Sequence, residues 1–143
     1  MPIEKYINHS RWIISALKEH NKIIKQEMNN KLCNRQFEYN GYYKKFCSLF
    51  FTYCKLLGSV DKEYQILLNS NNINKHSLTR LYNTYLLRAA SVFKESGYYL
   101  KVARQEMMYQ KNNFIILFQE MKMVADLLMI IQHDFVLLVK NLH

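Results

Sequence analysis

Glycine and proline are scarce in this chain. Its 143 residues contain three glycines and one proline, and the proline is Pro2, where it can open a helix. A β-sandwich or barrel needs turn residues every 8–12 residues or so, and this sequence offers few. The scarcity therefore excludes a many-turned β fold and favours an all-α protein.

Cysteine is also rare, and its pattern argues against disulfides. Cys33, Cys47 and Cys54 form an odd set without a CxxC pair. Cys47 and Cys54 would lie about 10 Å apart on one helical face, beyond the roughly 7 Å that a disulfide tolerates between Cα atoms. Glu4 and Arg11 fall where a signal peptide would be apolar. We therefore predict an intracellular protein, cytoplasmic or nuclear and not secreted.

Signatures of catalysis and of metal binding are missing as well. The carboxylates are scattered, no glycine-rich phosphate loop is present, and no two histidines are spaced four apart or near a cysteine. Adjacent His133 and Asp134 would point about 100° apart on a helix, so they cannot form a simple dyad. The histidines are His9, His20, His76, His133 and His143. The sequence predicts no enzyme, metal, cofactor or small-molecule substrate.

Apolar residues and positive charge are abundant. Half of the residues are apolar and the formal net charge is +9. Residues 1–58 carry ten Lys and Arg against four Asp and Glu, and residues 59–143 carry ten against seven. A chain of this length and composition predicts one domain with a substantial core. Its basic balance favours anionic partners without identifying them.

Two long apolar patterns with helical spacing occupy the last sixty or so residues. The first consists of Leu78, Tyr82, Tyr85, Ala89, Val92, Ser96, Tyr99 and Ala103. The second consists of Phe114, Phe118, Met121, Ala125, Leu128, Ile131, Phe135, Leu138 and Leu142. They predict helices at about 75–110 and 113–142. Lys122, Asp126 and His133 interrupt the second pattern, so we expect no membrane span.

Gly97 leaves an alternative open for the helix at 75–110. The helix could continue through Gly97, which would cost about 1 kcal/mol relative to alanine, or a hairpin could turn there. The run Ala90, Phe93, Gly97, Tyr99 and Val102 loosely resembles the inner positions of a tetratricopeptide hairpin over fewer than 20 residues. The unbroken spacing favours the continuous helix, and we infer no membership of a family.

Two more long helices are expected in the first half, at about 3–32 and 36–57. Asparagines between them mark a turn, and Gly41 suggests a break or a late start of the second helix. Gly58 and Ser59 predict its end, followed by a short helix at about 60–68. The predicted fold is therefore an all-α, single-domain bundle of four to five helices spanning residues 1–143.

A basic ridge on the first helix is the first candidate surface. At 100° per residue, Arg11, Lys18, Lys22 and Lys25 fall on one stripe beside the apolar face. Lys44 and Lys45 add cations beside two tyrosines. Cations hold phosphates and aromatic rings stack on bases, so these six residues are candidates for nucleic-acid binding. An ordinary solvated face explains the same stripe.

Surplus apolar residues provide the second candidate surface. The patterns of the last two helices extend beyond one face, as at Tyr98, Leu100 and Met108. Exposed apolar surface often marks an interface. We therefore predict a non-enzymatic interaction module that binds a protein partner or a second copy of itself. The alternative hypothesis is a basic protein that binds nucleic acid.

Overall fold

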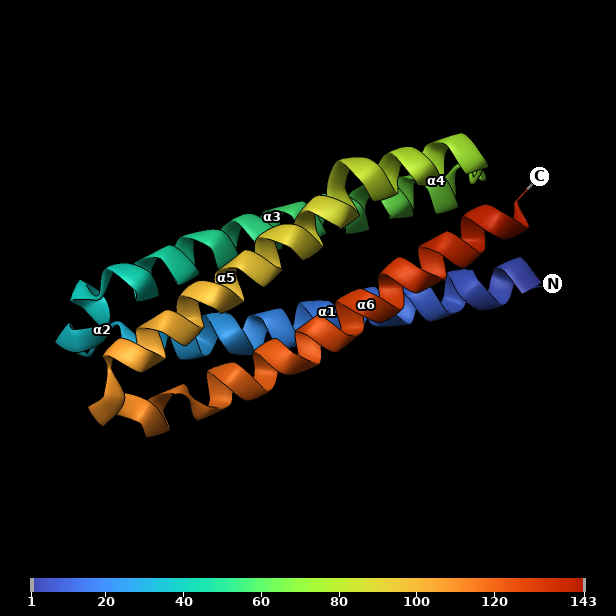
Figure 1. Ribbon diagram of the computed structural model, residues 1–143. Coiled ribbons are helices and arrows are strands. Elements are labelled where there is room, and N and C mark those ends of the chain that lie inside the picture. The colour runs from blue at the N-terminus through green and yellow to red at the C-terminus, as the bar shows by residue number, and fades with distance from the viewer. Residues whose placement is uncertain (1, 143) are drawn as a thin grey trace.

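Four long helices form an antiparallel bundle in the computed structural model, which describes residues 2–142 (Figure 1). They are α1 (Pro2–Lys31), α3 (Gly41–Asn69), a continuous helix composed of α4 (Lys75–Leu81), the π-helical turn η1 (Tyr82–Leu86) and α5 (Leu87–Glu106), and α6 (Ile115–Asn141). Two short elements lie between them: α2 (Arg35–Tyr39) and the 3-10 helix η2 (Met108–Phe114). Residues 2–142 contain no strand. The all-α prediction is confirmed.

The helices associate as two tightly packed pairs. α3 runs along α5, and α1 runs along α6 (Figure 1). α5 and α6 contact each other sparsely by comparison, as do α1 and α3. Both chain ends lie at the same end of the bundle as the connection from α3 to α4 (Figure 1).

Asparagine side chains cap the N-termini of three helices. The side chains of Asn34, Asn40 and Asn74 each accept a hydrogen bond of 2.9 Å from a backbone N–H in the first turn of α2, α3 and α4. Such caps satisfy amide groups that have no partner inside the helix. Asn40 separates α2 from α3, so the break or late start expected at Gly41 is confirmed.

The predicted end at Gly58 and Ser59 is wrong. α3 continues to Asn69 without interruption, so the separate helix expected at 60–68 is the last part of α3. No heavy atom of the surroundings lies within 4 Å of a Cβ placed on Gly58. Glycine therefore weakens this exposed turn without stopping it, because the buried side chains on either side, Leu57 and Val60, hold the helix to the core.

The predicted continuous helix is confirmed at Gly97, which lies inside α5. The π-helical turn η1 was not predicted. Buried residues of this helix are spaced by three or four except across η1, where Leu81 is followed by Leu86. The extra residue shifts the helical face, so Phe93 and Leu100 enter the core while Tyr99 is only half-buried.

The core is aromatic, and two polar side chains on α1 enter it. Ser10 and Asn21 are buried where an apolar pattern would have leucine. Asn21 accepts a hydrogen bond of 2.9 Å from the Tyr53 hydroxyl of α3. Ser10 donates to the Ile7 carbonyl at 2.9 Å, so its oxygen accepts from the Tyr64 hydroxyl at 2.7 Å. Buried hydrogen bonds therefore join α1 to α3.

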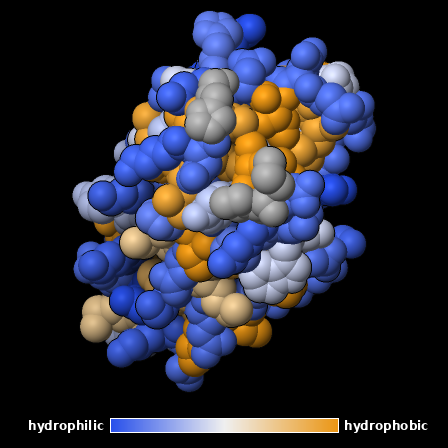
Figure 2. All heavy atoms as spheres, turned by 90° about the vertical axis from the view of Figure 1, so that its right-hand side faces the viewer, coloured by the Kyte–Doolittle hydropathy of each residue, from blue (hydrophilic) through white to orange (hydrophobic). Residues whose placement is uncertain are grey.

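The face drawn in Figure 2 is mainly hydrophilic, with apolar areas between the hydrophilic side chains. Figure 2 views the end of the bundle that holds both termini, and an apolar patch lies among the hydrophilic side chains there. No helix among residues 2–142 combines the length and the apolar character that a membrane span requires.

Candidate functional site

The predicted basic ridge lies along α1, but its members differ in their surroundings. Arg11, Lys18 and Lys22 are exposed, whereas Lys25 is half-buried. The Lys18 ammonium is 2.8 Å from a carboxylate oxygen of Asp61 on α3. The ridge is therefore partly neutralised by a neighbouring helix, which the sequence of α1 alone could not indicate.

A depression of about 540 Å³ lies beside this ridge, between α1 and α3. Arg11, Lys18 and Asp61 line it together with Trp12, whose surface is 63% exposed. The Trp12 ring also stacks on His9, with 6.1 Å between the ring centroids. An exposed tryptophan next to cations is a surface that can contact both bases and phosphates.

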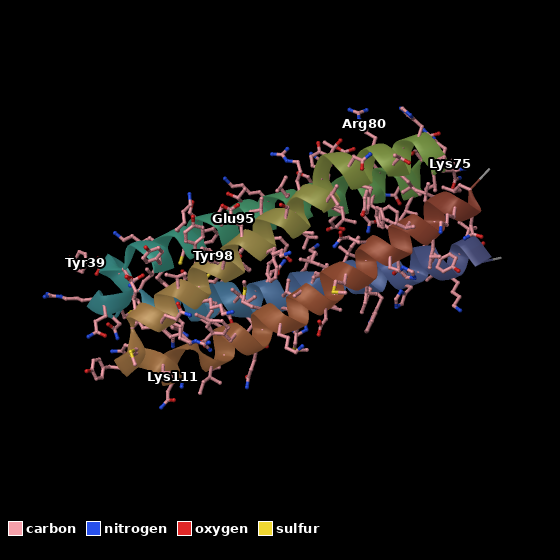
Figure 3. All side chains as sticks on the ribbon, in the orientation of Figure 1. Tyr39, Lys75, Arg80, Glu95, Tyr98 and Lys111 are labelled. Atoms are coloured by element: carbon pink, nitrogen blue, oxygen red, sulfur yellow. The ribbon has the colours of Figure 1, made fainter. Side chains whose placement is uncertain are left out.

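Lys44 and Lys45 are exposed in the first two turns of α3. The Lys44 ammonium lies 5.9 Å from the ring centroid of Tyr39. Figure 3 shows other cations at opposite ends of the bundle, with Lys111 near the Tyr39 end and Lys75 at the far end. The positive charge is therefore distributed along the bundle and not gathered at one end.

The three predicted partner-binding residues are not equally accessible. Tyr98 is 62% exposed on the middle of α5 (Figure 3), and Met108 is 74% exposed in η2. Leu100 is fully buried, so its assignment to an exposed surface is wrong. The phase shift at η1 explains the difference, because it turns Leu100 towards α6 and places it beneath a groove.

This groove lies between α5 and α6 and has a volume of about 760 Å³. Phe93, Met121 and Leu128 contribute apolar surface to it. A Cβ atom placed on Gly97 would lie 3.8 Å from the Cε atom of Met121. The whole lining is Leu87, Ala90, Ser91, Phe93, Lys94, Gly97, Leu100, Phe118, Met121, Lys122, Ala125, Leu128, Met129 and Gln132. Most of these residues were not predicted as a site.

Cations border the groove. Lys94 on α5 and Lys122 on α6 are its only charged lining residues within the described part of the chain. Lys122 also lies 3.9 Å from Asp126, one turn away, but both side chains are largely exposed. At one end, the Arg104 guanidinium lies 4.2 Å from the ring centroid of Phe118. The groove is therefore apolar within and basic at its edges.

Two histidines of α1 bond to carboxylates of α6, and the sequence did not predict these contacts. The Nδ1 atom of His9 is 2.6 Å from an Asp134 carboxylate oxygen, and that of His20 is 2.6 Å from Glu120. Asp134 is 4% exposed, so His9 provides the partner that a buried carboxylate needs. These pairs hold helices together. Among residues 2–142, no three His, Cys, Asp or Glu side chains gather as metal ligands, and His143 lies outside the described residues.

The cysteines differ in exposure. Cys33 is exposed, whereas Cys47 and Cys54 are half-buried on α3, and all three thiols are free. Burial raises the pKa of Cys47 and that of Cys54 to about 11, although the nearby Lys25 ammonium partly opposes the rise at Cys54. A raised pKa keeps a thiol protonated and therefore a poor nucleophile.

Comparison of the chain with protein-family models, with curated proteins and with solved structures finds no match. The assignment of a function consequently depends on the geometry of the surfaces described above.

Proposed function

We propose that this protein is a non-enzymatic interaction module that binds a partner protein in the groove between α5 and α6. The apolar lining of that groove carries the proposal. Leu87 and Met129 remain exposed to solvent there, at 45% and 70% of their surface. Exposed apolar surface in a concave site gains free energy when a partner removes it from water.

The packing of the bundle supports this surface as the interface. α5 and α6 make few contacts with each other, while their other faces pack tightly on α3 and α1. Binding in the groove would cover side chains that the fold itself leaves partly uncovered. Two of them, Met121 and Met129, have flexible thioether chains that adapt to the shape of a partner.

Site-specific photo-crosslinking in the cells that express the protein tests the proposal. A photo-reactive amino acid replaces Met129 in the groove or, as a control, Ile66, which is exposed on α3. We expect a discrete covalent adduct with a partner protein from position 129 and not from position 66. Adding Gly97→Leu, which fills the groove, should abolish the adduct. Equal adducts from both positions would contradict the proposal.

Direct binding of nucleic acid by α1 is a second candidate function. It is favoured by one observation: exposed Trp12 lines the same depression as Arg11 and Lys18. Binding through these cations should weaken steeply with salt, because each phosphate contact releases counterions. The ion pair of Lys18 with Asp61 makes Arg11 and Lys22 the more informative pair to change.

Fluorescence anisotropy with labelled oligonucleotides, from about 50 to 300 mM salt, tests this second candidate. Arg11→Glu/Lys22→Glu should lower affinity about tenfold or more, since like charges would face the phosphates. Lys75→Glu/Lys111→Glu changes the net charge equally at the two ends of the bundle and should have a smaller effect. Equal losses in the two variants would indicate attraction by net charge alone, and the ridge would not be a site.

A further inference from the structure

We infer that the partner segment in the α5–α6 groove is an amphipathic helix whose apolar face is flanked by acidic residues. This inference depends on the proposed function, since it names the class of partner for the same site. Three features of the groove support it: its length, its small residues and the charges at its edges.

The length of the groove suits a helix. Its lining runs from Leu87 to Leu100 on α5 and from Gln132 back to Phe118 on α6. Thirteen residues of helix rise about 20 Å, which equals three to four turns of a docked helix. A segment of that length places apolar side chains at positions i, i+3 or i+4, i+7 and i+11 in one line.

Small residues bring a partner backbone close to the bundle. Ala90, Gly97 and Ala125 lie among the larger apolar side chains of the lining. Leucine at these positions would fill the space that a docked helix needs. Because Gly97 lies beside Met121 in the sparsely packed seam, it marks the part of the groove where a larger side chain would have most effect.

Charge selects an acidic partner. The helices are antiparallel and Gly97 lies beside Met121, so Lys94 and Lys122 stand within about one turn of the same level, one on each helix. Arg104 adds a cation at one end, over Phe118. Among the described lining residues there is no carboxylate, and the exposed Asp126, 3.9 Å from Lys122 on the same helix, offsets that charge only in part because an exposed ion pair is weak. Glu or Asp on both flanks of a docked helix would meet them.

The same charges disfavour a second copy of this chain as the occupant. The net charge of each copy is +9, so two copies repel each other before they meet. Association through this groove would also bring basic edges towards a basic protein. A helix of opposite charge avoids both costs and associates faster by electrostatic attraction.

Binding of designed peptides to the full chain tests the inference, with fluorescence anisotropy as the readout. The first peptide is an amphipathic helix of about 15 residues with Glu on both flanks of its leucine face. The second carries Lys in place of Glu, and the third is a scrambled form of the first that is not amphipathic. Gly97→Leu fills the groove, and Gly58→Leu makes the same change on the exposed face of α3.

We expect the Glu peptide to bind the wild type and Gly58→Leu equally, and at least about tenfold more tightly than either other peptide. Gly97→Leu should weaken this binding at least tenfold. Lys94→Glu/Lys122→Glu should reverse the preference towards the Lys peptide. Circular dichroism of each variant shows whether it is folded before binding is compared.

Several outcomes would overturn the inference. Equal affinity for the Glu and Lys peptides, with loss in Gly97→Leu, would mean that the groove binds helices without selecting charge, and the proposed function would stand. Equal binding of the scrambled peptide would mean general attraction by charge. Failure of every peptide to bind, or dimerisation in sedimentation velocity that Gly97→Leu abolishes, would also exclude an acidic helix. The proposed function fails separately, by crosslinking.

Discussion

At the scale of the residue, the buried tyrosines differ in what their hydroxyl groups contact. Tyr53 and Tyr64 bond to Asn21 and Ser10, whereas the Tyr43 hydroxyl is buried without a hydrogen-bond partner in the described structure. Burial raises the pKa of Tyr43 and of Tyr53 far above the usual range, so both stay neutral. Leaving a buried polar group unpaired costs free energy, and among the side chains of residues 2–142 this cost falls on Tyr43 alone.

Removing these hydroxyl groups should therefore have opposite consequences. Tyr43→Phe should leave the free energy of unfolding unchanged or raise it, because no hydrogen bond is lost. Tyr53→Phe should lower it by about 1–2 kcal/mol, because the Asn21 oxygen loses its donor inside the core. Urea unfolding followed by circular dichroism measures both. A larger loss in Tyr43→Phe than in Tyr53→Phe would show that Tyr43 has a partner.

Thiol reactivity should follow exposure and pKa. At about pH 7.5, iodoacetamide should modify exposed Cys33 at least tenfold faster than Cys47 and Cys54, whose raised pKa leaves little thiolate. Raising the pH towards 11 should accelerate the two slow sites about tenfold per unit, since thiolate is the nucleophile. Mass spectrometry of peptides gives the three rates. Equal rates at neutral pH would contradict the burial of the two α3 thiols.

At the scale of the element, apolar spacing predicts where the long helices are, and glycine misleads about where they end. Gly41 does begin α3 after its Asn40 cap, but Gly58 and Gly97 lie inside helices. Glycine weakens the interior of a helix by about 1 kcal/mol, and packing of the flanking side chains decides whether the helix continues. That packing involves other helices, so the local sequence does not contain it.

Because Gly58 lies inside α3, replacing it should change the stability of the fold. Gly58→Ala should raise the free energy of unfolding by about 0.5–1 kcal/mol, since alanine restricts the unfolded chain and its Cβ meets open space. Gly41→Ala, at the first residue of α3, should gain less because it is not in the helix interior. Thermal unfolding compares the two. Destabilisation by Gly58→Ala would contradict a regular helix through this position.

The π-helical turn shows why one side of the groove was not predictable. In a regular helix the pattern through Tyr85, Val92 and Tyr99 would face the core. η1 inserts one residue between Leu81 and Leu86, which turns Phe93 and Leu100 inward instead. The basic ridge lies on the regular helix α1, where Arg11, Lys18 and Lys22 are exposed as their spacing indicates and Lys25 is half-buried. The groove needs both the phase shift and the position of α6, neither of which the spacing reveals.

At the scale of the whole molecule, polar links and apolar surface are on different seams. Ser10 and Asn21 join α1 to α3, and His9 and His20 join α1 to α6, so α1 is connected by hydrogen bonds on two sides. The α5–α6 seam has an apolar groove and the Arg104 contact with Phe118. The first helix therefore holds its neighbours through polar contacts, while the α5–α6 seam leaves an open apolar groove.

Changing His9 tests whether its contact with Asp134 stabilises the packing of the first helix on the last. His9→Ala should lower the free energy of unfolding by about 1–3 kcal/mol, because it removes the partner of a buried Asp134 carboxylate. His133→Ala, which truncates the exposed histidine next to Asp134, should change it by less than about 0.5 kcal/mol. Urea unfolding of the full chain measures both variants.

Adding Asp134→Leu to His9→Ala separates the loss of a contact from the burial of an unpaired charge. If the unpaired carboxylate causes the destabilisation, the double variant should recover most of the lost stability, since an apolar side chain suits that buried position. If the hydrogen bond itself supplied the stability, the double variant would remain as unstable as His9→Ala. Recovery would mean that the pair fixes which helices meet and adds little net free energy, so that α1 and α6 are held together mainly by their apolar core.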